Sequence, residues 1–387
     1  MSLVANNQYQ KIANSCLIIR ELIRGRKSRI GLAHLLGLQP STVTYSTARL
    51  IESGLIREEE ASSGGKSGRK GILLGLNPDY GRVCGIELLV GYYRIVTCDI
   101  SGSIISHGTY VYDDTITAPL GTKERFIQLL ACTRRQMEIL TQGYPIRGVC
   151  IAIAGIISHD FHTIIDSWTH GLHGDDFAEH LLSCPYPVWF ENDANCAAQK
   201  ALFKDKFTND SFLYSLVHYY KKETIPSNVP AVGIGMGVVI DGSLYRGWTN
   251  RAGEFRSVLY SGSSFNGQLA LTNENLIALE TDEHLQKAFM KELLSNLFSA
   301  EAIINPRTIF LGGDLVKKAL VERVLQTEFP SMGTYVQEEE SLFHIVDDAT
   351  WDVSHGACIT VLSSMFHIPH VGEQNLMAWE WKERIGQ

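Results

Sequence analysis

Hydrophobic residues in the first 77 positions recur at the helical period in three successive stretches. In the first stretch they fall at i, i+4, i+7 and i+11 and predict an amphipathic helix through Ile12, Cys16, Ile19 and Ile23. Ser28 is placed to cap a short second helix that ends at Gly37. We expect this helix to point Leu32, Leu35 and Leu36 inward. Pro40 fits the first turn of a third helix, which we expect to run to about Ser53 and to stop at Gly54.

The third helix has two chemically different faces. The face expected to be buried carries Val43, Thr47, Leu50 and Ile51. The opposite face is short, polar and aromatic, without the carboxylates usual on a merely solvated helix, and carries Ser41, Thr42, Tyr45 and Arg49. Two helices joined by a short turn, the second with such a face, predict a helix-turn-helix that reads DNA.

Two strand-like runs, 55–60 and 72–76, follow the third helix. The segment between them is rich in Gly and Ser and carries three cations, Lys66, Arg69 and Lys70. A basic hairpin tip directly after a helix-turn-helix predicts a wing that follows the DNA backbone or enters a minor groove. A plain disordered loop is the alternative.

From Arg82 onward, strand-like runs and helical stretches alternate in two related halves, which indicates an α/β protein with two lobes. Strands are expected near 83–89, 93–99, 103–110, 148–157, 212–218, 231–240 and 308–312, and helices near 123–140 and 176–183. The expected domains are a winged helix-turn-helix over 1–78, a first α/β lobe over 79–193 joined by 372–387, and a second α/β lobe over 194–371.

Charge is unevenly distributed along the 387 residues, whose net charge is −8. Of the 34 Lys and Arg, 11 lie in residues 1–77, against 5 of the 42 Asp and Glu, so the rest of the chain holds 23 against 37. A basic N-terminal part on an acidic body is typical of a protein whose anionic partner binds at one end.

Membrane insertion and export are not indicated. The longest apolar run, 149–157, is far shorter than the roughly 20 residues that span a bilayer, and it predicts a buried strand. The N-terminus lacks the basic-then-apolar pattern of a signal peptide, so we expect a cytoplasmic protein with no membrane partner. The eight cysteines are scattered singly without a Cys-x-x-Cys pair, which indicates buried thiols rather than disulfides or zinc ligands.

Several short motifs span nearly the whole chain: Gly68-Arg69-Lys70, Ile151-Ala152-Ile153-Ala154-Gly155, Glu191-Asn192-Asp193-Ala194-Asn195, Gly233-Ile234-Gly235-Met236-Gly237 with Asp241-Gly242-Ser243-Leu244-Tyr245, Ala252-Gly253-Glu254, and Asn305-Pro306 leading into Leu311-Gly312-Gly313. One such motif alone would be weak evidence for any family. The ordered set resembles the ROK family, which comprises repressors, open reading frames and kinases. The resemblance implies a winged helix-turn-helix followed by a two-lobed, actin- and hexokinase-like (ribonuclease H-like) α/β domain.

The resemblance also implies roles for single residues. In the family's kinases the Asp of the Glu-Asn-Asp motif takes a proton from the sugar, and the adjacent Asn and the Glu of Gly-Glu bind hydroxyls. Asp193 then corresponds to a vestigial base, and the expected effector-binding residues are Gly155, Asn192, Asp193 and Glu254. Amides and carboxylates on rigid loops suit vicinal hydroxyls. From the residues alone, Asp193 could simply cap a helix that starts at Ala194.

Three departures from the family pattern predict that catalysis is lost. Where the kinases carry Asp-x-Gly-Gly-Thr for the ATP phosphates, this chain has Glu87-Leu88-Leu89-Val90-Gly91-Tyr92-Tyr93. The second phosphate loop, Gly-Thr-Gly in the kinases, here is Val232-Gly233-Ile234. Glu254 is followed by Phe255-Arg256-Ser257 in place of Gly-His and a cysteine cluster, so we expect no zinc site and one sugar contact fewer. Because phosphoryl transfer depends on positioning and charge stabilisation, we predict no enzyme activity and no cofactor.

Together these patterns predict a DNA-binding transcriptional repressor of carbohydrate-metabolism genes that senses a sugar or sugar phosphate between its lobes. A homodimer or homotetramer is expected on a double-stranded DNA operator. The expected DNA-binding residues lie in the third helix and the wing: Ser41, Thr42, Thr44, Tyr45, Arg49, Lys66, Arg69 and Lys70. Two alternatives stay open: a sugar kinase that carries a DNA-binding head, and a constitutive DNA-binding scaffold that senses nothing.

Overall fold

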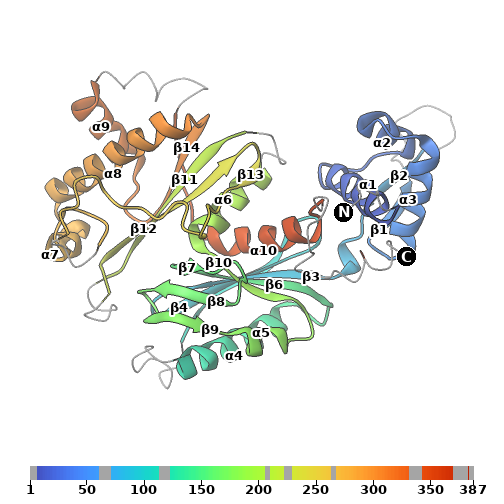
Figure 1. The fold of residues 1–387 in the computed structure, drawn as a ribbon, viewed down its shortest axis with the longest axis horizontal. Helices are drawn as coiled ribbons and strands as arrows, with labels where there is room; N and C mark the ends of the chain where they lie inside the picture. The colour runs from blue at the N-terminus through green and yellow to red at the C-terminus, as the bar shows by residue number, and fades with distance from the viewer. Residues whose placement is uncertain are drawn as a thin grey trace.

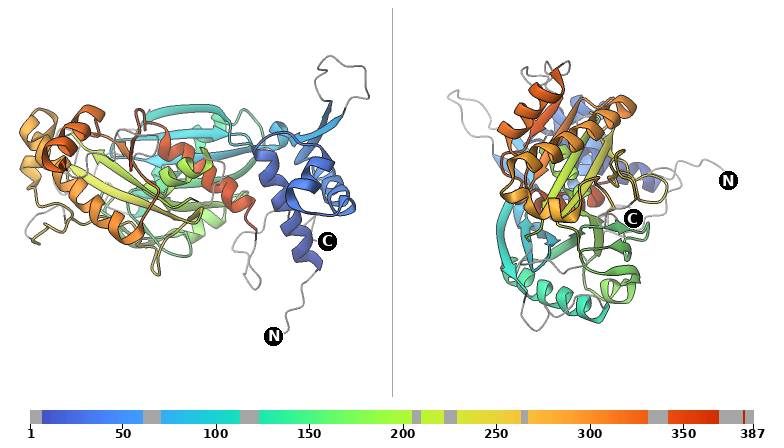
Figure 2. Two further views of the ribbon diagram at one scale, coloured as in Figure 1. Left: turned by 90° about the horizontal axis from the view of Figure 1, so that it is seen from above. Right: turned by 90° about the vertical axis from the view of Figure 1, so that its left-hand side faces the viewer.

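The computed structural model describes residues 7–60, 71–112, 123–204, 210–221, 229–262, 267–330 and 342–368, together with Lys382. A small N-terminal domain lies at one end of a larger body, and the body consists of two lobes, each built on a sheet (Figure 1). The same arrangement is seen from above and from the side in Figure 2.

The N-terminal domain consists of three helices and an antiparallel hairpin: α1 (Asn7–Ile23), α2 (Arg29–Leu36), α3 (Pro40–Glu52), β1 (Ile56–Glu60) and β2 (Ile72–Leu76). The Ser28 hydroxyl accepts a hydrogen bond from the N–H of Gly31, and Gly37 ends α2 in the left-handed conformation with a φ of 63°. The predicted cap and stop of the second helix are therefore confirmed. The predicted buried face of the third helix is confirmed at Val43, Thr47 and Leu50.

Two sequence-based expectations about apolar residues are wrong. Leu35 is 57% exposed instead of pointing inward, because an eight-residue helix buries one narrow stripe, in which Leu32 is fully enclosed. The apolar run at 149–157 is not one strand. β6 (Ile146–Ile153) ends before Gly155, whose φ of 155° turns the chain into the separate strand β7 (Ile156–Ile157).

The first lobe has a mixed sheet of five strands in the order β10-β6-β3-β4-β5. Its other strands are β3 (Arg82–Leu88), β4 (Tyr92–Cys98), β5 (Ile104–Val111) and β10 (Val188–Asn192). A short helix, η1 (Pro78–Tyr80), connects this sheet to the N-terminal domain. One face of the sheet is covered by α4 (Lys123–Leu140) and α5 (Ala178–Leu182), and a small sheet is formed by β7, β8 (Thr163–Ser167) and β9 (Leu172–Asp176) (Figure 1).

The second lobe repeats this pattern with the strand order β13-β12-β11-β14-β15. Its strands are β11 (Phe212–Tyr219), β12 (Val232–Ile240), β13 (Ser243–Leu244), β14 (Thr308–Gly313) and β15 (Phe343–Ile345). Its helices are α7 (Asn273–Ile277), η2 (Ala278–Glu280), α8 (Glu283–Ile304) and α9 (Lys318–Glu328). In each lobe three antiparallel strands are followed by two parallel ones, so the two related halves predicted from the sequence are confirmed.

Two helices, α6 (Asp193–Lys204) and α10 (Asp352–Met365), pack against each other between the two sheets (Figure 1). α6 contacts β11 and β12 of the second lobe, and α10 contacts β3, β4 and β6 of the first. A Cβ atom added at Gly356 would lie 1.8 Å from the carbonyl oxygen of Cys196, and one at Gly85 would lie 1.9 Å from that of Ser354. Glycine at these two positions therefore allows α10 to approach both α6 and β3 closely.

One continuous apolar core connects the N-terminal domain to these two helices. It includes Ile19 of α1 and Leu362 of α10, with Phe366 directly after α10. The Cys16 thiol donates a hydrogen bond to the carbonyl oxygen of His367 at 3.3 Å. Because protein interiors are close-packed and transmit strain, a movement of α10 must also be accommodated by α1.

Replacing Gly356 by Ala should destabilise the protein, although Ala inside a helix is normally more stable than Gly by about 1 kcal/mol. The added methyl group would overlap the Cys196 carbonyl, and such over-packing costs roughly 1–3 kcal/mol. Urea unfolding gives the difference in the free energy of unfolding. Gly71→Ala is a matched control, because a Cβ there meets nothing within 4 Å. A Gly356→Ala protein as stable as the wild type would contradict this packing.

Candidate functional site

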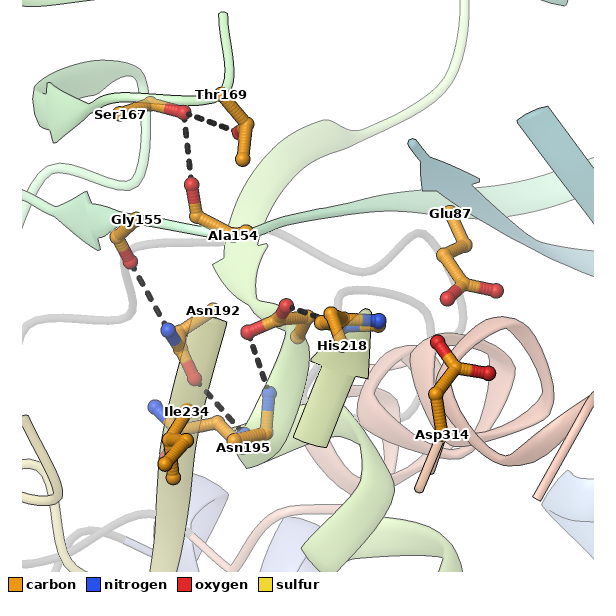
Figure 3. A network of polar contacts seen from close by, with 12 residues as sticks. Glu87, Ala154, Gly155, Ser167, Thr169, Asn192, Asn195, His218, Ile234 and Asp314 are labelled. Atoms are coloured by element: carbon orange, nitrogen blue, oxygen red, sulfur yellow. Dashed lines mark hydrogen bonds and ion pairs between the residues drawn. The ribbon is translucent and has the colours of Figure 1, made fainter. Parts of the chain in front are cut away.

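Polar side chains gather between the lobes, where β10 ends and α6 begins (Figure 3). Asn192 caps α6, because its Oδ1 accepts the N–H of Asn195 at 3.0 Å, and its Nδ2 donates to the carbonyl oxygen of Gly155 at 3.0 Å. Asp193 is the first residue of the helix, and its Oδ1 accepts the N–H of Ala194 at 2.8 Å. The capping role is therefore shared, and the second oxygen of Asp193 is left for another partner.

That partner is His218, a residue of β11 outside every sequence motif. Its Nε2 lies 3.0 Å from Oδ2 of Asp193, and the two side chains are only 11% and 7% exposed. Burial alone would lower the pKa of His218, but the hydrogen bond and charge of Asp193, with the charges of Glu87 and Asp314, raise this pKa above its ordinary value. The geometry favours an imidazolium paired with a carboxylate, which ties the start of α6 to the second sheet.

Two further carboxylates, Glu87 and Asp314, point toward each other beside His218 in Figure 3. Glu87 lies near the end of β3 and is buried, with its Oε2 3.2 Å from Nη1 of Arg94. Burial raises the pKa of Glu87 to about 7, although the charge of Arg94 acts in the opposite direction. Asp314 follows β14 and accepts the N–H of Tyr219 at 3.0 Å. Two acidic groups therefore lie beside the Asp193–His218 pair, one of them in contact with Arg94.

Gly155 brings the turn after β6 into direct contact with β8. A Cβ atom on Gly155 would lie 2.4 Å from the carbonyl oxygen of Asp166. The Ser167 hydroxyl donates to the carbonyl oxygen of Ala154 at 2.7 Å (Figure 3). Because the Gly155 carbonyl also holds Asn192, the segment at Asp166 and Ser167 is fixed against the same wall of the cleft.

Glu254 enters the cleft from the second lobe. The N–H of Met236 donates to the carbonyl oxygen of Gly253 at 2.9 Å, and Gly235 of β12 forms an antiparallel bridge with Glu254. Glu254 is exposed at the surface, although the surrounding protein partly buries its carboxyl group. This burial, followed by the charges of Asp193 and Asp166, raises the pKa of Glu254 to about 7. The four expected effector residues thus lie near one another, where the two lobes meet.

The segment in place of the first kinase phosphate loop is a tight hairpin. The N–H of Leu89 donates to the carbonyl oxygen of Tyr92 at 3.0 Å across a two-residue turn that includes Gly91, with a φ of 84°. The Tyr112 hydroxyl donates to the Leu89 carbonyl at 2.7 Å. This turn is therefore closed by its own hydrogen bonds and by a neighbouring tyrosine.

The glycines of the second motif, on β12, are explained by packing. A Cβ atom at Gly235 would lie 3.0 Å from Cβ of Ala194, and one at Gly237 would lie 2.4 Å from Cβ of Ala198. Both neighbours belong to α6. Glycine at these positions lets α6 lie directly on the second sheet, so these residues are needed whether or not a phosphate binds.

A buried ion pair also connects the lobes. The Arg246 guanidinium, just after β13, donates to Oε2 of Glu191 on β10 at 2.6 and 3.0 Å. The other oxygen of Glu191 accepts from the side chain of Asn195 at 3.0 Å. The sequence motifs single out neither Arg246 nor His218. Each of them holds a residue that lies within a motif: Arg246 holds Glu191, and His218 holds Asp193.

The outward face of α3 is the second candidate site. Ser41, Thr44 and Tyr45 are exposed there, and Thr42 and Arg49 are partly exposed. The Arg49 guanidinium lies 5.0 Å from the centre of the Tyr45 ring, so the aromatic ring and the cation form one surface. The three expected wing residues, Lys66, Arg69 and Lys70, lie outside the described residues.

No family model matches the chain. The xylose repressor of Bacillus subtilis (strain 168) is 26% identical over 255 residues, which cover 65% of this chain and 61% of that repressor. The xylose repressor of Staphylococcus xylosus is 27% identical over 236 residues, which cover 60% of this chain and 56% of that one. The chain thus matches less than two thirds of the length of these curated relatives.

Solved structures resemble the whole fold. A ROK family transcriptional regulator described as a homologue of the Escherichia coli MLC protein has a TM-score of 0.62 at 16% identity, covering 92% of this chain and 97% of that one. A ROK family glucokinase from Streptomyces griseus, solved with glucose and AMPPNP, has a TM-score of 0.51 at 15% identity, covering 72% of this chain and 98% of that one. The fold class predicted from the sequence is confirmed.

Two negative findings apply to the described part of the chain. None of its helices is long and apolar enough to cross a membrane. Its His, Cys, Asp and Glu side chains form no group of three or more that is placed to hold a metal ion.

The pH dependence of stability should report on Glu87. Its pKa of about 7 in the folded protein exceeds the ordinary 4.5, so the folded state binds more protons than the unfolded state between these values. The contribution of Glu87 to stability is therefore fully present below about pH 4.5 and falls as the pH rises through 7. In urea unfolding, Glu87→Gln should match the wild type near pH 5 and gain stability relative to it by pH 8. A constant difference across that range would contradict the raised pKa.

Proposed function

We propose that this chain, a ROK-family protein by its sequence relatives and its fold, is a DNA-binding transcriptional repressor of carbohydrate-metabolism genes that responds to a sugar-type effector. The observation that carries this proposal is the apolar core that runs from the N-terminal domain into α6 and α10. Since α6 begins at Asp193 in the cleft, a ligand bound there and a duplex bound at α3 act on one packed unit.

In the proposed complex with DNA, α3 lies in a major groove. Its exposed short polar residues and Tyr45 contact base edges, and Arg49 contacts a base or a phosphate. The wing cations Lys66, Arg69 and Lys70 follow the backbone or enter a minor groove. A homodimer or homotetramer in the cytoplasm would bring two copies of α3 to half-sites about 34–36 Å apart.

The proposed effector site lies between the lobes, at Gly155, Asn192, Asp193 and Glu254. Two of these residues offer carboxylates and one offers an amide, which suits the hydroxyls of a sugar. The names of the relatives point to xylose as the first sugar to test. Closing the lobes on a sugar would shift α6 against α10, and the segment that follows α10 contacts α1, where the Cys16 thiol donates to the His367 carbonyl.

Sugar phosphorylation is the less favoured alternative, and the solved kinases of this fold are its support. In this structure Asp193 pairs with His218 and accepts the N–H of Ala194, so its carboxylate holds the start of α6 in place. The carboxylate of Asp314 beside this pair would repel a triphosphate. We therefore propose that the fold serves sensing and not catalysis.

DNA binding should depend on α3 and on the wing in different ways. In gel-shift titrations with a duplex selected from a random-sequence library, Tyr45→Ala should cost about 1–3 kcal/mol and relax sequence preference. Arg69→Ala with Lys70→Ala should weaken binding to all sequences and make the salt dependence shallower by about two units of log–log slope. Arg134→Ala, which removes a cation from α4, is the control and should change neither. Unaltered binding by both variants would overturn the assignment of these surfaces.

Ligand-induced thermal stabilisation separates the three functions. A ligand that binds the native state alone raises the melting temperature. We expect a monosaccharide to raise it, Mg-ATP to leave it unchanged, and Asp193→Asn to reduce the response to sugar. Sugar-dependent formation of ADP would favour the kinase instead. A protein that binds DNA but responds to no sugar in a broad panel would be the constitutive scaffold.

A further inference from the structure

Trp168 presents a large apolar surface directly after β8, and 58% of the residue is exposed. Single exposed hydrophobic residues are common, so exposure alone indicates no site. Trp168 differs in that its only polar atom is already bonded, because Nε1 donates to Oδ2 of Asp166 at 2.9 Å. The indole is therefore fixed by a hydrogen bond while its apolar surface faces outward.

Asp166 fixes a second ring next to the indole. Its Oδ1 lies 2.8 Å from Nδ1 of His173. The imidazole meets the indole edge to face, with ring centres 5.8 Å apart and planes at 81°. One carboxylate thus orients both rings before any ligand binds. Binding to such a surface loses less side-chain entropy than binding to a freely rotating tryptophan.

This pair of rings adjoins the proposed effector site through backbone contacts. The carbonyl oxygen of Asp166 packs against Gly155, where a Cβ atom would come within 2.4 Å of it, and the Gly155 carbonyl holds Asn192. Ser167, between Asp166 and Trp168, is bonded to Ala154 at 2.7 Å. Trp168 is therefore the next residue after a segment that packs on the turn at Gly155, and its indole is bonded to Asp166 of that segment.

We propose that Trp168 is an aromatic subsite on which the C–H face of a pyranose ring stacks, while Asn192, Asp193 and Glu254 bind its hydroxyls. The inference rests on the proposed function and makes the effector more specific. A stacked ligand must have a rigid ring with an apolar face, so an acyclic polyol with the same hydroxyl groups fits poorly. The carboxylate of Asp166 favours a neutral sugar over its phosphate.

Isothermal titration of the full chain with ring and open-chain partners tests this subsite. The probes are D-xylose against xylitol and D-glucose against sorbitol, since each pair has similar hydroxyls but only the sugar has a ring. For a sugar that binds, we expect the wild type to prefer it over the polyol by about tenfold or more. Trp168→Ala should lose most of that preference, because its affinity for the sugar falls while its affinity for the polyol changes little. Trp168→Phe, which keeps a ring, should retain part of it.

The controls separate this inference from the function on which it rests. Ile303→Ala removes an exposed apolar side chain at the end of α8 and should leave every affinity unchanged. Gel shifts should give the same DNA affinity for Trp168→Ala as for the wild type without sugar, which shows that the variant is folded. If the wild type binds a sugar and Trp168→Ala binds it equally well, the subsite is wrong and the sensor stands. If the wild type binds neither these sugars nor any other pyranose tested, both proposals fall.

Discussion

The packing of α6 against α10 is the contact on which the rest of this molecule depends. At Gly356 and Cys196 the two helices approach so closely that a single added methyl group would overlap a carbonyl oxygen. α6 lies on the second sheet and α10 on the first, so their contact sets the relation between the lobes. Because the same apolar core continues into α1, it also sets the relation between the lobes and the N-terminal domain. Close packing of this kind makes two sites on opposite ends of the core physically dependent on one another.

The proposed effector site between the lobes offers polar groups that suit a sugar, and we propose that its charges do not suit a nucleotide. Asn192, Asp193 and Glu254 project from rigid element ends, as hydroxyl recognition requires. Beside them lie the Asp193–His218 pair, the Glu87–Arg94 pair and the carboxylate of Asp314. Buried ion pairs of this kind contribute little net stability, but removing one partner is costly. Such groups are therefore expected to specify one arrangement of the lobes.

Much of the fold could be predicted from the sequence, because the signals for it are local. Periodicity, the Ser28 cap and Gly37 fixed the three N-terminal helices, and the alternation of strands and helices indicated two similar lobes. Leu35 was misplaced because spacing alone does not reveal where a short helix leaves the core. His218 and Arg246 could not have been found in this way. Each acts through a partner 25 or 55 residues away, and only the folded chain brings such pairs together.

We propose that the effector site and the N-terminal domain are two sites on one coupled unit. The most direct test is the affinity of the full chain for its stabilising sugar, measured with and without a saturating amount of the selected duplex. Linkage requires that DNA change the sugar affinity by the same factor as the sugar changes the DNA affinity, and a factor of roughly 5–150 is typical of such coupling. We predict equal factors within this range. A sugar affinity that is identical for the free and the DNA-bound protein would show that the two sites are not coupled.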